Sequence, residues 1–88
     1  MSYKIYTSPS FDREFKKLDK YTQILIRGWI KKHLENSEIP EVTGEKMTEE
    51  KSDLWRYRIG EYRIICKIEN DEMIILMLRI GHEGDICC

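Results

Sequence analysis

The chain has 88 residues, of which 41% are hydrophobic and 35% charged, a composition typical of one globular domain over residues 1–88 that excludes a disordered protein. It has no apolar run near the roughly 20 residues of a membrane span and begins without a signal peptide, so we expect a cytoplasmic protein with no membrane partner. The net charge of -1 hides an uneven distribution, because residues 1–34 carry eight basic and three acidic side chains whereas residues 35–53 carry two and seven.

The first predicted elements are a strand and a helix. The segment "SYKIYT" has strand-forming residues, and Ser8 or Ser10 can cap a following helix that has Pro9 in its first turn. The apolar residues of this helix share one stripe: Phe11, Phe15 and Leu18.

A second helix is predicted for residues 21–36, so that the two helices form a hairpin. Its basic side chains at Arg27, Lys31 and Lys32 are expected in solvent. The expected buried stripe consists of Tyr21, Ile24, Leu25, Trp29 and Ile30.

Residues 37–53 contain a proline, a glycine and little apolar periodicity, so they are predicted to form a loop. Two interpretations of the loop stay open. It is an ordinary solvated segment, or its six acidic side chains shield basic groups nearby.

Three strands are predicted at residues 54–59, 62–68 and 73–80, joined by Gly60-Glu61 and by a turn at residues 69–72. Two consecutive hairpins make an antiparallel meander. The predicted fold class is therefore α+β, with an N-terminal strand, a helical hairpin packed on one face of the sheet, and the meander.

A tight turn at Gly60-Glu61 places Arg58 opposite Arg63, and Arg56 shares their side because it lies two residues from Arg58. Like charges that face each other across strands are unfavourable, so an anion such as a nucleic-acid phosphate is the expected partner. The alternative is that these arginines pair with carboxylates of the acidic loop. The other face is expected to be core: Trp55, Tyr57, Ile59, Tyr62, Ile64 and Cys66.

The three cysteines are Cys66, Cys87 and Cys88. Their number and spacing fit neither a disulfide framework nor a paired zinc motif, so reduced thiols are expected. A zinc site made by Cys66, His82 and the terminal pair is the weaker interpretation, and no metal or cofactor is expected. Cys66 is expected in the core, and the terminal pair in an exposed tail that oxidation can join between molecules.

The stretch "LWRYRIGEYRIICKI", together with "REFKKLDKYTQ" and "GHEGDI", closely resembles the RelE/ParE superfamily of bacterial type II toxins over nearly the whole chain. The resemblance implies a RelE-like fold and a cognate antitoxin as partner. In the RelE branch it also implies cleavage of messenger RNA in the ribosomal A site, without a metal. ParE-type relatives on the same fold inhibit DNA gyrase, and the fold alone does not choose between these activities.

The same resemblance implies the site residues. Basic side chains at the positions of Arg56, Arg58 and Arg63 hold the RNA phosphate, and His82 is the candidate for proton transfer or, alternatively, a polar turn residue. Close relatives end in Gly-His-Arg, two variable or acidic positions, and Ile-Tyr. Here Glu83 replaces the arginine and Cys87 the tyrosine, which is expected to weaken phosphate binding and to remove a stacking ring.

The sequence therefore leaves three alternative functions open. The first is a ribosome-dependent mRNA endonuclease, weakened or inactivated at Glu83 and Cys87. The second is a non-catalytic module that binds antitoxin through a face where Ile65, Leu76 and Leu78 accompany the arginines. The third is a gyrase inhibitor of the ParE type.

Overall fold

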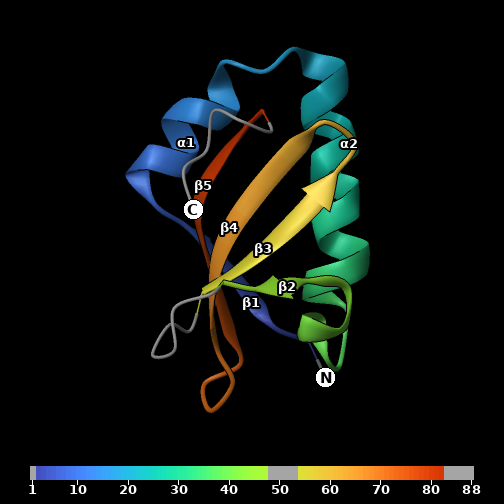
Figure 1. The fold of residues 1–88 in the computed structure, drawn as a ribbon, viewed down its shortest axis with the longest axis vertical. Helices are drawn as coiled ribbons and strands as arrows, with labels where there is room; N and C mark the ends of the chain where they lie inside the picture. The colour runs from blue at the N-terminus through green and yellow to red at the C-terminus, as the bar shows by residue number, and fades with distance from the viewer. Residues whose placement is uncertain (1, 48–53, 83–88) are drawn as a thin grey trace.

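A five-stranded sheet forms the centre of the protein, with the strand order β1-β5-β4-β3-β2. The computed structural model describes residues 2–47 and 54–82. In the ribbon, α2 lies behind the sheet and α1 lies beside β5 (Figure 1). The elements are β1 (Lys4–Thr7), α1 (Pro9–Lys16), α2 (Lys20–Ile30), a π-helical segment η1 (Lys31–Glu35), a 3-10 segment η2 (Pro40–Thr43), β2 (Glu45–Lys46), β3 (Leu54–Ile59), β4 (Tyr62–Glu69) and β5 (Ile74–His82).

The two helices begin at side-chain caps. Ser8 Oγ accepts a hydrogen bond from the N–H of Phe11, and a carboxylate oxygen of Asp19 accepts one from the N–H of Thr22. Ser8 Oγ also donates to the carbonyl of Leu78 at 2.7 Å, which fixes the start of α1 against β5. The predicted helical hairpin is confirmed, with Ser8 as the cap of its first helix.

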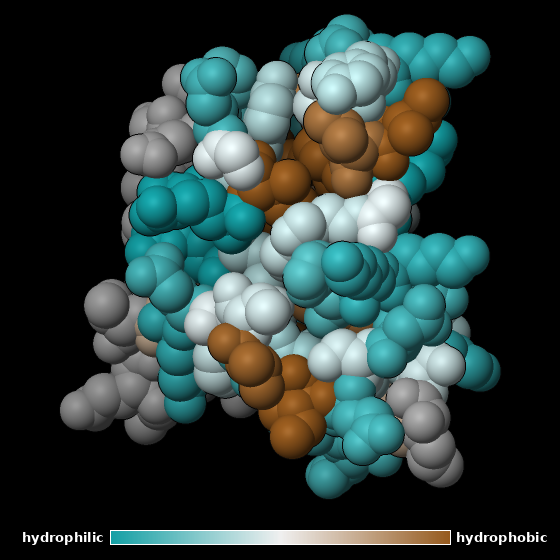
Figure 2. All heavy atoms as spheres, turned by 90° about the vertical axis from the view of Figure 1, so that its right-hand side faces the viewer, coloured by the Kyte–Doolittle hydropathy of each residue, from teal (hydrophilic) through white to brown (hydrophobic). Residues whose placement is uncertain are grey.

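The second helix buries only part of the predicted stripe. Trp29 and Ile30 are partly buried and pack against the core, as predicted. Ile26 and Leu34 are fully buried, whereas Tyr21, Ile24 and Leu25 are 71%, 57% and 51% exposed. The sequence contains two overlapping apolar stripes about 100° apart on the helix, and both are compatible with its periodicity. Contact with the sheet selects the stripe through Ile26 and Leu34. Tyr21, Ile24 and Leu25 are exposed on the side of the molecule where α2 lies, and Figure 2 shows hydrophobic residues at the surface of that side.

The meander has the predicted register. Gly60 takes a positive φ of 59° in the turn, as a tight hairpin requires, and Arg58 pairs with Arg63 and Tyr57 with Ile64. β5 then pairs antiparallel with β4, and β1 joins the other side of β5 in parallel. The α+β class with an N-terminal strand, two helices and a meander is confirmed.

The segment predicted as a loop contains two short elements. Residues 40–43 form η2, and residues 45–46 form β2, which adds a fifth strand beside β3. The buried Tyr57 hydroxyl donates to the carbonyl of Pro40 at 2.7 Å, and Gly44 lies so close to the Tyr57 ring that a Cβ there would be 2.7 Å from it. Tyr57 is a strand residue far along the chain, so the local sequence does not reveal this anchor.

The described helices include none that is long and apolar enough to cross a membrane.

One face of the sheet and the helices enclose the core. Residues from both layers form a single buried cluster: Tyr3, Phe11, Ile26, Leu34, Tyr57, Ile64, Cys66, Ile68, Ile75, Met77 and Ile80. Within the described residues, no helix covers the opposite face of the sheet (Figure 1).

Candidate functional site

Three arginines occupy the sheet face opposite the core. Arg58 pairs with Arg63 across the β3–β4 ladder, and Arg56 pairs with Ile65 one rung further along. Arg58 is exposed, and Arg56 and Arg63 are partly buried. Because the intervening residue Tyr57 is 0% exposed in the core, the alternation of β3 directs Arg56 and Arg58 to the same side. The predicted grouping of the three arginines is therefore confirmed by the register.

Arg56 also has a partner in the acidic segment. Its Nη2 lies 3.2 Å from Oε1 of Glu45, the residue directly opposite in β2. The Glu45 side chain is 65% exposed, and such exposed pairs contribute only about 0.2–1 kcal/mol. The acidic segment thus reaches Arg56, through a weak contact that a phosphate can replace.

A fourth arginine joins this face through a β-bulge. The register between β4 and β5 shifts after Ile65, which pairs with Arg79, whereas the next residue, Cys66, pairs with Met77. The extra residue changes the alternation of β5, so Arg79 lies on the same rung as Arg56 and Ile65. Strand alternation without a bulge assigns Arg79 to the core side, and for this reason the sequence did not reveal it.

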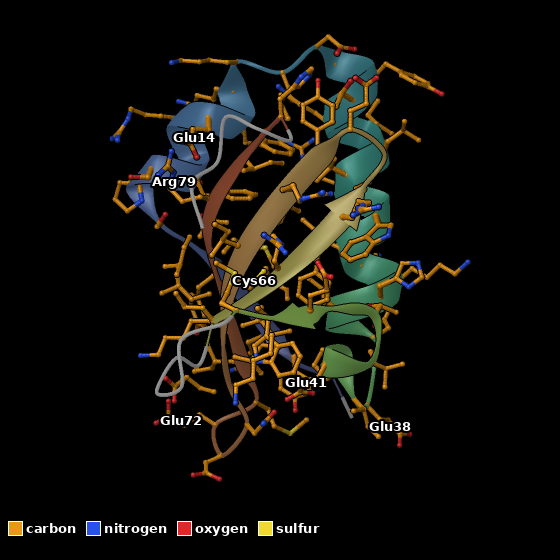
Figure 3. The ribbon with its side chains drawn as sticks, viewed as in Figure 1. Glu14, Glu38, Glu41, Cys66, Glu72 and Arg79 are labelled. Carbon is orange, nitrogen blue, oxygen red and sulfur yellow. The ribbon has the colours of Figure 1, made fainter. Side chains whose placement is uncertain are left out.

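Glu14 of α1 holds Arg79 (Figure 3). One carboxylate oxygen accepts hydrogen bonds from Nε at 2.8 Å and Nη2 at 2.7 Å of Arg79, and the other accepts one from the N–H of Ile80 at 3.0 Å. Partial burial opposes ionisation of Glu14, but the hydrogen bonds from Arg79 and Ile80 outweigh it and lower the pKa of this carboxyl. The carboxylate therefore fixes the guanidinium and the edge of β5 together.

His82 lies apart from the three arginines. It pairs with Tyr62, and the two rings meet edge to face with their centroids 4.7 Å apart. Tyr62 alternates with Arg63, so this ring pair lies on the helix side at the end of the sheet. His82 and Arg79 instead border one open pocket of about 270 Å³, together with Glu14, Lys17 and Tyr62.

The remaining predicted site residues, Glu83 and Cys87, lie outside the described residues. Cys66 lies in the core as predicted, with its Sγ 3.6 Å from the sulfur of Met77, and burial raises the pKa of its thiol. Within residues 2–47 and 54–82, no cluster of His, Cys, Asp or Glu has the arrangement of a metal site.

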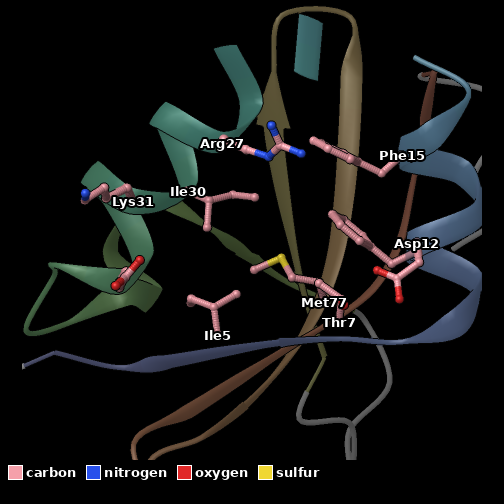
Figure 4. Close-up of a pocket in the computed structure, with 10 residues that line it drawn as sticks. Ile5, Thr7, Asp12, Phe15, Arg27, Ile30, Lys31 and Met77 are labelled. Atoms are coloured by element: carbon pink, nitrogen blue, oxygen red, sulfur yellow. The ribbon is translucent and has the colours of Figure 1, made fainter. Parts of the chain in front are cut away.

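A larger pocket of about 420 Å³ lies between α1, α2 and β1 on the helix side. Figure 4 shows the Arg27 guanidinium between the helices, near Phe15, and the Met77 side chain below it. The guanidinium carbon is 5.2 Å from the centre of the Phe15 ring. This pocket is on the opposite side of the sheet from the arginines, so it is not part of the site they form.

Comparisons with known proteins agree on the kind of protein. A family model described as the ParE toxin of the type II toxin-antitoxin system parDE matches residues 5–86. A comparison with curated proteins found no match.

Several solved structures share the fold. The toxin-antitoxin complex RelBE2 from Mycobacterium tuberculosis matches with a TM-score of 0.77 and 17% identity, covering 94% of this chain and 100% of that chain. The RelE-RelB complex from Pyrococcus horikoshii OT3 gives 0.77 and 21%, with 98% and 100% covered. The RelBE complex from E. coli gives 0.73 and 15%, with 93% and 98% covered. At these identities, the likeness establishes the fold.

Proposed function

The chain belongs to the family of ParE toxins, within the RelE/ParE superfamily of type II toxin-antitoxin systems, and we propose that it acts in the cytoplasm by cutting messenger RNA in the ribosomal A site. The observation that carries this proposal is the placement of Arg56, Arg58 and Arg63 on one sheet face, with Arg58 directly opposite Arg63. Like charges that lie directly opposite each other are unfavourable in a sheet, so a bound anion stabilises this pair. An RNA phosphate supplies that anion, and guanidinium groups bind phosphate in a two-pronged geometry.

The chemistry that these groups support is attack by a 2′-hydroxyl on the adjacent phosphorus. The hydroxyl proton passes to a base, the bond from phosphorus to the 5′ oxygen breaks, and that oxygen takes up a proton. Arginines that are already in place stabilise the negative charge that develops on the phosphate oxygens. His82 is the proposed proton-transfer group. Its ring packs on Tyr62 on the helix side at the end of β5, so this role requires the RNA to reach it around that end of the sheet.

We further propose that Glu83 and Cys87 weaken this activity. A carboxylate beside the phosphate repels it, and a thiol offers no ring for a base to stack on. Replacing them by Glu83→Arg with Cys87→Tyr should therefore strengthen cleavage.

Primer extension on a message held by purified translating ribosomes tests the proposal. We expect A-site cuts that become more frequent in the Glu83→Arg, Cys87→Tyr variant and fall about 100-fold when Arg58→Gln is added. Lys46→Gln, which removes an exposed charge in β2, is the matched control and should leave the cuts unchanged. If neither the native chain nor the restored variant produces A-site cuts, the cleavage proposal is wrong.

The proposed partner is an antitoxin encoded beside the toxin, as in the RelBE complexes that share the fold. Leu76 and Leu78 are partly exposed, so the arginine face also offers some apolar area to a partner helix, whereas Ile65 on the same face is buried, at 6% exposed. Co-expression with the neighbouring reading frame should give a stable complex. A chain that forms this complex but never cuts RNA would instead be the non-catalytic antitoxin-binding module.

Inhibition of DNA gyrase is the second candidate, because the family model that matches the chain is that of the ParE toxin. Supercoiling by purified gyrase in the presence of the protein separates the two activities. Inhibition of supercoiling without A-site cuts would favour the ParE-type function.

A further inference from the structure

We propose that Arg79, together with Lys17, forms a second phosphate-binding subsite beside the arginine group of Arg56, Arg58 and Arg63. The inference rests on the proposed function, because it extends the path of the same RNA strand across the sheet. It adds a contact from β5 and α1 to a site that the sequence had placed in β3, β4 and the C-terminal tail.

The first argument is position. The bulge puts Arg79 on the rung that also holds Arg56 and Ile65. β3 and β5 are separated by β4 alone, so the backbones at Arg56 and Arg79 are about 10 Å apart. A strand whose phosphate lies on the arginine group therefore brings a neighbouring phosphate within reach of Arg79.

The second argument is orientation. Glu14 contacts Nε and Nη2 of Arg79 and accepts a hydrogen bond from the N–H of Ile80, so the guanidinium is held by a carboxylate that is itself bound to the strand. The Arg79 side chain nevertheless stays 47% exposed. A long side chain that is held in place loses less conformational entropy when it binds a phosphate.

The third argument is the pocket that Arg79 borders. Lys17 at the end of α1 lines the same pocket, so among the described residues two cations, Arg79 and Lys17, and the carboxylate of Glu14 border it. The ring pair of Tyr62 and His82 forms another part of the wall. This ring pair lies on the helix side of the sheet, so a strand that occupies the subsite passes around the end of β5, where an aromatic ring can stack on an unpaired base.

The salt dependence of RNA binding tests this subsite, since each phosphate contact on a single strand contributes about 0.7 to the slope of log K against log salt. The full chain is titrated with a short, labelled single-stranded RNA over a range of salt concentrations. For Arg79→Gln and for Lys17→Gln, we expect a slope smaller by about 0.7 and binding about five-fold weaker at 0.1 M salt. Arg79→Lys should restore the slope, because a lysine also neutralises one phosphate.

The control variants distinguish an error in the subsite from an error in the proposed RNA-binding face. Lys17→Gln leaves the Glu14–Arg79 pair intact, so it tests the subsite even if Arg79→Gln disturbs folding. If Arg58→Gln lowers the slope but neither subsite variant does, the subsite is wrong and the proposed function stands. If Lys46→Gln lowers it equally, the effect is general charge, which also overturns the subsite. An unchanged slope in Arg58→Gln would overturn the RNA-binding face itself.

Discussion

At the residue scale, Glu14 connects the surface helix α1 to β5 through hydrogen bonds. It accepts hydrogen bonds from Arg79 and from the N–H of Ile80, a residue that is 2% exposed. The contact joins α1 to the edge of β5 just beyond the bulge. A buried N–H without an acceptor costs free energy, so the carboxylate matters even where its ion pair is partly exposed.

Substitutions of Glu14 test this contact between α1 and β5. Glu14→Ala leaves the N–H of Ile80 without its acceptor and should lower the free energy of unfolding by about 1–3 kcal/mol. Glu14→Gln keeps an oxygen for Ile80 and should cost less. Urea denaturation followed by circular dichroism measures both, and equal losses in the two variants would contradict the assigned role of the Ile80 bond.

The same residue predicts a pH dependence. Because the folded-state pKa of Glu14 lies below the ordinary value of 4.5, its ionised form stabilises the folded protein above that pH, and the stabilisation is lost as the pH falls through the folded pKa. The stability difference between the native chain and Glu14→Gln should therefore shrink when urea denaturation is repeated at about pH 3. A difference that stays constant would show that the carboxylate charge contributes nothing.

At the scale of elements, α2 shows how tertiary contact selects one side of a helix. Ile26 is 1% exposed and Leu25 is 51% exposed, although they are neighbours with similar side chains. The sheet contacts only one of the two stripes. The other stripe contains Tyr21, Ile24 and Leu25, which are in contact with solvent.

The two neighbours make a direct comparison. Ile26→Ala should cost about 2–5 kcal/mol of unfolding free energy because it opens a cavity in the core. Leu25→Gln should change that free energy by no more than about 0.5 kcal/mol, since its side chain is already half in water. Urea denaturation of the two variants measures both changes. A large loss of unfolding free energy in Leu25→Gln would mean that Leu25 is buried, as the sequence predicted.

A second element depends on one hydroxyl. The Tyr57 hydroxyl donates to the carbonyl of Pro40 and so ties η2 to β3. Tyr57→Phe keeps the ring and removes the bond, and we expect a loss of about 1–2 kcal/mol in thermal or urea unfolding. Tyr21→Phe is the matched control, because the Tyr21 side chain is 71% exposed; it should unfold like the native chain.

At the scale of the whole molecule, stability is expected to decrease outward from the centre of the sheet. β4 is bonded on both sides and contains the buried residues Ile64, Ile65 and Cys66, whereas β2 is a two-residue strand at the edge. Amide hydrogens in β4 should exchange only through global unfolding, and those of β2 through local opening. Hydrogen exchange measured residue by residue checks this, and equal protection of both strands would contradict it.

The sequence alone determined the order of the elements, the cap at Ser8, the tight turn at Gly60 and the facing pair of Arg58 and Arg63. These features follow from periodicity, capping and turn geometry, which act over a few residues. The tertiary structure decided which stripe of α2 is buried, that the acidic segment forms a strand beside β3, and that Arg79 reaches the arginine face. Each of these depends on contacts between residues far apart in the chain: packing selects one of two stripes, Tyr57 anchors a distant segment, and a bulge changes which side of a strand a residue occupies. Local patterns contain no information on such contacts.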